Sequence, residues 1–95
     1  FFCPQVNHKF YDVYHIFNIR HPQRDNLRRF LLDNNIKTEI HYPIPPHKQR
    51  ALIGLFLNNY PISEEIHNTT LSLPISFAHT EDEIIKIITV LNEFK

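Results

Sequence analysis

The chain has 95 residues, of which 42% are hydrophobic, 13% aromatic and 21% charged, so its composition is that of one ordinary globular domain or a piece of one. Ten basic and ten acidic residues cancel, which argues against a general nucleic-acid binder. One glycine and one cysteine exclude a P-loop, a Rossmann fingerprint, an internal disulfide framework and a cysteine-based zinc finger, and no apolar stretch approaches the about 20 residues that cross a membrane.

The first part of the chain predicts an extended lead-in, a strand, a helix and a second strand. Residues 1–9 show no periodicity. Residues 10–20 alternate at period two, which indicates a strand that ends before Pro22. Residues 25–35 have helical spacing, with Asp25 as the expected N-cap and Asn34-Asn35 as the expected end. Residues 36–41 alternate again and predict a short strand.

A stiff segment with three prolines separates this part from the rest. Residues 42–47 exclude both a helix and a strand ladder. Residues 47–57 predict a short helix with Leu52, Leu55 and Phe56 directed inward. A turn over 58–61 and a helix starting near Ser63 follow, and residues 71–76 suggest a short edge strand interrupted by Pro74.

The clearest predicted helix begins at Thr80. Thr80 and Glu83 form a capping-box pattern, and Ile84, Ile87, Ile88 and Leu91 recur at helical spacing. This order of elements predicts an α+β fold in a single domain over residues 1–95, with a small, mostly antiparallel sheet of about three strands and helices packed mainly on one face.

The segment from His41 to Gln49 carries the most chemistry, because it holds two imidazoles, a phenol, an amine and an amide on a rigid backbone. Rigidity lowers the entropy lost on binding, which suits a ligand contact. The alternative is a plain connection whose side chains are solvated or packed.

The other histidines and the arginines also leave alternatives open. His15 lies within an apolar strand pattern, as a core histidine or as a support for the nearby loop. The histidine pairs are six residues apart and lack the i, i+4 spacing of zinc helices, so we expect no metal site. The cluster of Arg20, Arg24, Arg28 and Arg29 either receives a phosphate or an acidic partner, or is a solvated helix face. No nucleophile–base pair supports an independent active site, so we expect no catalytic residue in this chain.

Together, these patterns resemble a known family. Residues 13–20 (VYHIFNIR), Arg24-Asp25 opening a helix, residues 35–47 (NIKTEIHYPIPPH), and the segments 62–75 and 80–94 follow in order the C-terminal small domain of nucleotide-sugar aminotransferases of the DegT/StrS type. The sequence HYPIPPHKQ is most similar to that of family members that aminate a dTDP-linked 3-keto-6-deoxyhexose. Asn35 stands where the family often has glycine, and either residue accepts a left-handed conformation.

The resemblance implies a fold-type-I, pyridoxal 5'-phosphate (PLP)-dependent, dimeric enzyme of the bacterial cytoplasm that moves an amino group, typically from glutamate, to a keto-sugar nucleotide. The Schiff-base lysine and the phosphate site of such enzymes lie in a large N-terminal domain, so this chain is expected to bind no cofactor and to be inactive alone. The resemblance also implies that His41 and Tyr42, and with them His47, contact the sugar nucleotide.

Two other functions are compatible with the residues. One is a stand-alone nucleotide-sugar-binding or regulatory module that has lost catalysis. The other is a small metal-binding protein, suggested by the seven histidines.

Overall fold

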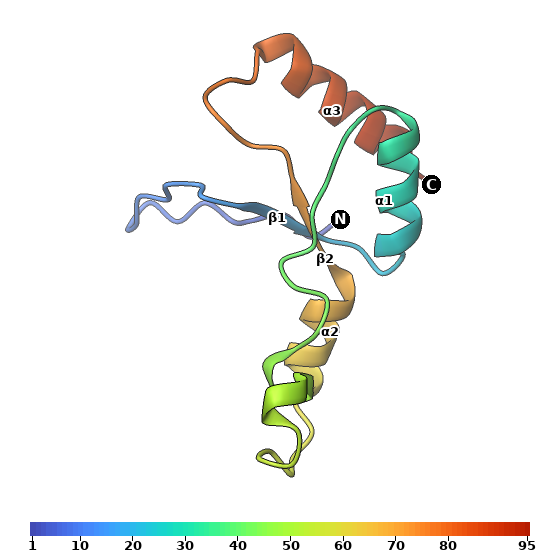
Figure 1. Cartoon of the computed structure of the whole chain (residues 1–95). Coiled ribbons are helices and arrows are strands. Elements are labelled where there is room, and N and C mark those ends of the chain that lie inside the picture. The colour runs from blue at the N-terminus through green and yellow to red at the C-terminus, as the bar shows by residue number, and fades with distance from the viewer.

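The computed structural model describes residues 1–95 and confirms the predicted α+β class (Figure 1). Two strands and three α-helices follow one another as β1 (Phe17–Arg20), α1 (Arg24–Asp33), α2 (Pro61–Thr69), β2 (Thr70–Leu73) and α3 (Glu81–Glu93). Two single 3-10 turns, Pro46–Lys48 and Arg50–Leu52, lie between α1 and α2.

The sheet is an antiparallel pair in which Phe17 lies opposite Leu73 and Arg20 lies opposite Thr70. Single bridges add a neighbour on each side, Phe2 beside Arg20 and Glu39 beside Ser72. The sheet therefore has two strands, one fewer than the predicted three, and β2 is flanked on both sides. The predicted strand over residues 71–76 is present as β2 but shorter, because it ends before Pro74, and the Glu39 bridge means that it is not a free edge.

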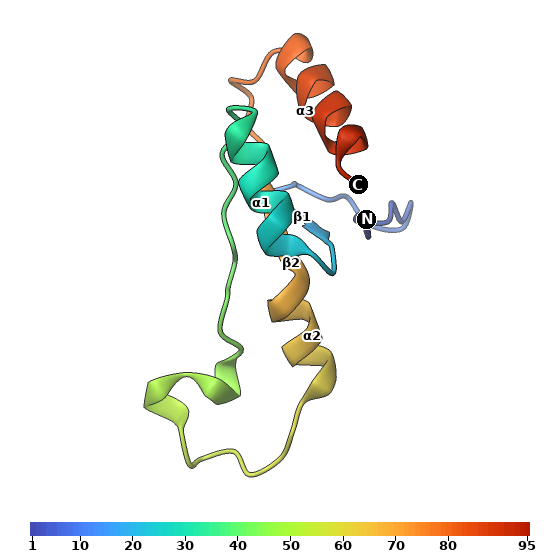
Figure 2. The same cartoon turned by 90° about the vertical axis from the view of Figure 1, so that its right-hand side faces the viewer.

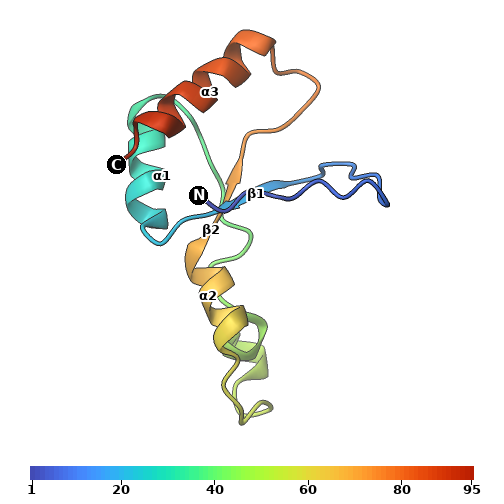
Figure 3. The ribbon, with the colours of Figure 1, turned by 180° about the vertical axis from the view of Figure 1, so that it is seen from behind.

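The predicted strand over residues 10–20 forms only in its last four residues. The chain turns before them, because Tyr14 has a φ of 47° and its N–H donates to Asp12 Oδ1 at 2.7 Å. Residues 1–16 form an arm that doubles back on itself, visible as the blue projection in Figures 1 and 3. The predicted strand over residues 36–41 is likewise reduced to the single bridge at Glu39, because only this residue pairs with β2.

The predicted helix over residues 47–57 is wrong. Gln49 is extended, with φ −64° and ψ 139°, so it interrupts the helical path, and Gly54 has a φ of 89°. Two single 3-10 turns replace the helix. Leu55 and Phe56 are exposed rather than inward, at 71% and 46% of their surface, which leaves this segment without the packing that stabilises a short helix.

Helix α1 starts one residue earlier than predicted and is capped differently. Gln23 is its N-cap, and Asp25 instead pairs with Arg24 at 2.6 Å within the first turn. The predicted C-terminal end is confirmed, with Asn35 at a φ of 61°. The N–H groups of Asn35 and Ile36 donate to the carbonyls of Leu32 and Leu31, which is the Schellman arrangement.

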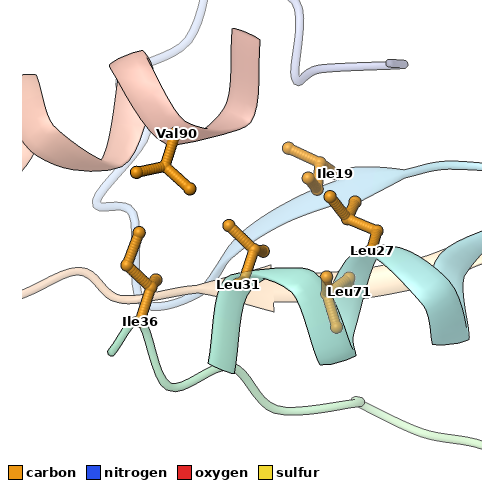
Figure 4. Close-up of a cluster of buried hydrophobic side chains, with 6 residues drawn as sticks. All are labelled: Ile19, Leu27, Leu31, Ile36, Leu71 and Val90. Atoms are coloured by element: carbon orange, nitrogen blue, oxygen red, sulfur yellow. The ribbon is translucent and has the colours of Figure 1, made fainter. Parts of the chain in front are cut away.

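The core lies where α1 and α3 cover one face of the sheet (Figures 2 and 4). Its buried side chains come from both strands, both helices and the turn that follows α1: Ile19, Leu27, Leu31, Ile36, Leu71 and Val90. Only eleven of the 95 residues are buried, and the radius of gyration of 15.5 Å exceeds the about 13 Å of a compact 100-residue domain. The arm and the segment that contains the two 3-10 turns and α2 project from this small core.

Helix α3 depends on its predicted capping box, which is confirmed. Thr80 Oγ1 accepts from the Glu83 N–H at 3.3 Å, and Glu83 Oε2 accepts from the Thr80 N–H at 2.9 Å.

We expect Thr80→Ala to lower the free energy of unfolding by about 1 kcal/mol, measured from the urea midpoint. Thr89→Ala is the control, since exposed Thr89 donates only to the carbonyl of Ile85, and its effect should stay within about 0.5 kcal/mol. Equal losses in both variants would contradict the capping role.

Candidate functional site

His41 is held on the face of the sheet opposite the core. Ile19 and Leu71 point into the core, and side chains alternate along a strand, so their neighbours Asn18 and Ser72 face the other way as a cross-strand pair. The Nδ1 atom of His41 lies 2.7 Å from Ser72 Oγ. Ser72 Oγ in turn donates a hydrogen bond to Asn18 Oδ1. Three side chains from separate segments are therefore connected in one chain of hydrogen bonds.

Tyr42 follows His41 and remains exposed at 63% of its surface. Its ring meets that of His41 edge to face, with centroids 5.3 Å apart. Its carbonyl accepts a hydrogen bond from His67 Nδ1 on α2. The backbone is thus tied to α2 while the phenol stays free, so Tyr42 is available to a ligand.

His47 is engaged within the chain. Its Nε2 lies 3.0 Å from Glu64 Oε1, and only 11% of its side chain is exposed. Its ring packs against Tyr60 at 4.9 Å. Lys48 Nζ lies 2.9 Å from the other oxygen of Glu64. The structure therefore brings His41 and Tyr42 together and fixes His47 to α2 as an anchor of the loop; its substrate contact stays a prediction.

A cavity of about 210 Å³ lies beside His41 and is lined in part by His15, Lys37, Thr38 and Ser72. The hydroxyl of Thr38 is buried and has no hydrogen-bond partner. His15 is exposed, so its assignment as a core histidine is wrong. Its position in the wall of the same cavity as His41 agrees with the alternative, a role beside the loop.

The four arginines do not form one site. Arg24 is buried, which fits neither reading, and its guanidinium donates to the carbonyls of His67 and Thr70 at 3.1 and 3.0 Å. Arg20 lies 3.5 Å from Glu65. Arg28 and Arg29 are exposed and correspond to the solvated helix face. Arg24 thus joins α1 to the junction between α2 and β2.

A larger cavity of about 430 Å³ lies between α3 and the sheet, and ten of its fourteen lining residues are hydrophobic, among them Ile19, Ile84 and Ile88. It offers apolar surface but few groups for chemistry. No three histidine, cysteine or acidic side chains gather where they could hold a metal ion. None of the helices is long and apolar enough to cross a membrane.

Sequence reasoning missed four residues that organise this site, namely Asn18, Ser72, Glu64 and His67. Asn18 and Ser72 meet only through the strand register, and Glu64 and His67 act from α2 on the preceding loop. The alternation of apolar and polar residues over positions 17–20 was the one sequence signal that Asn18 faces away from the core. Nothing local indicated that Ser72 would pair with it.

Comparisons with known proteins agree on one family. The sequence profile of the DegT/DnrJ/EryC1/StrS aminotransferase family matches residues 2–92. The dTDP-3-amino-3,6-dideoxy-alpha-D-galactopyranose transaminase of Aneurinibacillus thermoaerophilus is 40% identical over 82 residues, which are 86% of this chain and 23% of that protein. The "Pleiotropic regulatory protein" of Geobacillus stearothermophilus is 34% identical over 88% of this chain and 23% of its own length.

The fold agrees as well. The crystal structure of S. venezuelae DesV in complex with a ketimine intermediate superimposes with a TM-score of 0.90 at 30% identity. That match covers 97% of this chain and 25% of DesV. The chain thus spans about a quarter of the length of the relatives that it matches.

The pair of cations on Glu64 leads to a pH prediction. Hydrogen bonds from Lys48 and then His47 lower the pKa of Glu64 from 4.5 to about 2. A carboxylate with a depressed pKa stabilises the folded state fully above its unfolded pKa and loses that contribution as the pH falls through the folded pKa. We therefore expect the free energy of unfolding to fall more steeply between pH 4.5 and 2 in the wild type than in Glu64→Gln, measured by urea denaturation.

The matched control for this experiment is Glu93→Gln, since Glu93 is exposed at the end of α3. Its pH profile should follow that of the wild type. Parallel profiles for the wild type and Glu64→Gln would contradict the anchoring of the loop by this carboxylate.

Proposed function

Because the chain belongs to the DegT/DnrJ/EryC1/StrS aminotransferase family, we propose that it is the C-terminal domain of a PLP-dependent enzyme that transfers an amino group, from glutamate, to a keto-sugar nucleotide. The observation that carries this proposal is the continuous match over residues 2–92 to proteins about four times as long. The enzyme acts in the synthesis of polysaccharides or deoxysugars, in the bacterial cytoplasm.

The substrate that fits best is a dTDP-linked 3-keto-6-deoxyhexose. The relative with 40% identity is named for a dTDP-3-amino-3,6-dideoxyhexose, and the HYPIPPHKQ segment favours the same subgroup. His41 and Tyr42 are assigned to the sugar nucleotide, because an imidazole and an exposed phenol are held together beside a cavity. Such groups donate and accept hydrogen bonds to hydroxyls.

The cofactor is assigned to the part of the enzyme outside this chain. PLP supplies an electron sink for the proton shift and needs a lysine partner, and such a lysine is activated by desolvation or by a neighbouring cation. All five lysines of this chain are exposed, and Lys48 is paired with Glu64. The residues present do not fit a PLP site, so the chain contributes substrate contacts and is inactive alone.

Unburied apolar side chains favour a partner that packs on this chain. Tyr11 and Val13 on the arm are 93% and 78% exposed, and Leu57 near the tip of the other projection is 94% exposed. Exposed apolar patches mark interaction surfaces. We assign them to the large domain of the same protein and to the second subunit of a homodimer.

A second candidate is a stand-alone nucleotide-sugar-binding or regulatory module. The name of the Geobacillus stearothermophilus relative, "Pleiotropic regulatory protein", favours it. It predicts specific binding of a nucleotide sugar by the 95 residues without any further domain.

The deciding experiment compares this chain with the protein expressed from its complete coding sequence. We expect the complete protein to convert glutamate and a dTDP-3-keto-6-deoxyhexose to 2-oxoglutarate and the amino sugar, followed by chromatography, and the 95-residue chain to show no turnover. His41→Ala in the complete protein should raise the KM for the sugar nucleotide about tenfold, the equivalent of about 1.4 kcal/mol.

Asn58→Ala is the control, because Asn58 is exposed in the loop before α2 and makes no side-chain hydrogen bond. Its KM should be unchanged. A complete protein that binds the nucleotide sugar but transfers no amino group would favour the second candidate.

A further inference from the structure

We propose that Asn18 and Ser72 are positioning residues that keep the ring proton of His41 on Nδ1 and leave Nε2 as a hydrogen-bond acceptor. The tautomer follows from the hydrogen bonds alone. Its consequence for sugar recognition rests on the proposed function.

The direction of the hydrogen bonds is set at Asn18. Its Oδ1 atom only accepts, and Ser72 Oγ donates to it. A serine hydroxyl has one proton and two lone pairs, so the Ser72 oxygen has no proton left for His41. His41 Nδ1, 2.7 Å away, is then the donor. In a neutral imidazole a protonated Nδ1 leaves Nε2 with the lone pair.

The strand pairing makes this arrangement rigid. Asn18 and Ser72 are directly opposite each other in the ladder, and Ser72 is only 5% exposed. Glu39, two residues before His41, exchanges both backbone hydrogen bonds with Ser72 at 3.2 and 2.7 Å. Water therefore has little access to the hydroxyl, and the backbone that carries His41 is tied to the strand that carries its partner.

Three other groups around the cavity are charged or titratable. Lys37, Glu39 and His15 line it together with His41. None of them makes a hydrogen bond to the His41 ring, whose one side-chain hydrogen-bond partner is Ser72. The proton on Nδ1 is thus assigned by Ser72 and not by a neighbouring charge.

The chemical consequence is a site that selects a donor. A neutral His41 with a free Nε2 accepts a hydrogen bond from a hydroxyl of the hexose, whereas the opposite tautomer would present an N–H there.

The test is a direct observation of the ring nitrogens. The protein, expressed from its complete coding sequence and labelled with ¹⁵N only at histidine rings, is examined by NMR at a pH where histidine is neutral. The His41 signals are identified by their loss in His41→Gln. We expect a proton on Nδ1 in the wild type.

In Asn18→Leu the Ser72 hydroxyl has lost its acceptor and is free to donate to His41 Nδ1, so the ring proton should move to Nε2. Asn18→Asp retains an acceptor and should keep the proton on Nδ1. Ser76→Ala is the control, because Ser76 is an exposed serine beyond β2. It should leave the ring proton of His41 on Nδ1.

A proton on Nε2 in the wild type, or a proton that stays on Nδ1 in Asn18→Leu, overturns the proposal. Should Asn18→Leu not fold, Ser72→Ala decides the same question: the preference for Nδ1 is lost if Ser72 sets it, and persists if Ser72 does not. These results do not depend on any aminotransferase activity.

Kinetics then test the consequence. Asn18→Leu should raise the KM for the nucleotide sugar about tenfold, which corresponds to one hydrogen bond of about 1.4 kcal/mol, and leave the KM for glutamate unchanged. Asn18→Asp should restore the KM for the sugar. Absence of transamination in the wild type would contradict the proposed function, while the tautomer measurement would still stand.

Discussion

The antiparallel pairing of β1 with β2 is the constraint on which the rest of the structure depends. Four residues on each strand are paired, and prolines at positions 22 and 74 end the two strands. Because side chains alternate across a strand, this short ladder separates an apolar face from a polar one. Ile19 and Leu71 receive the helices on one side, and Asn18 and Ser72 receive His41 on the other.

β2 connects these two sides most directly, since it belongs at once to the core, to the α1 junction and to the candidate site. The carbonyl of Thr70 accepts a hydrogen bond from buried Arg24, Leu71 is fully buried, and Ser72 is hydrogen-bonded to His41. If the pairing of the two strands shifted by one residue, the side chains of the two faces would be exchanged. This shift would expose the core and remove the partner of the imidazole together, so the stability of the fold and the geometry of the site have a common origin.

Where the sequence pattern has a partner within the chain, prediction succeeded. Thr80 and Glu83 meet within one helical turn, and the left-handed end of α1 at Asn35 needs only local backbone geometry. His41 and Tyr42 were selected as candidate ligand residues from the rigid loop and the family resemblance, and their contact with a ligand stays a prediction. Asn18 and Ser72 could not, because 54 residues separate them and only the register brings them together.

The two largest errors have the same physical cause. Residues 10–16 alternate as a strand and residues 47–57 have apolar helical spacing, yet Tyr11 and Leu55 remain exposed at 93% and 71%. A hydrophobic period shows that a segment has an apolar face, but it does not say which surface covers that face. Here neither face is covered by the chain's own core of six side chains. The failed secondary-structure predictions therefore coincide with the exposed apolar surfaces that we propose to pack on a further domain or subunit.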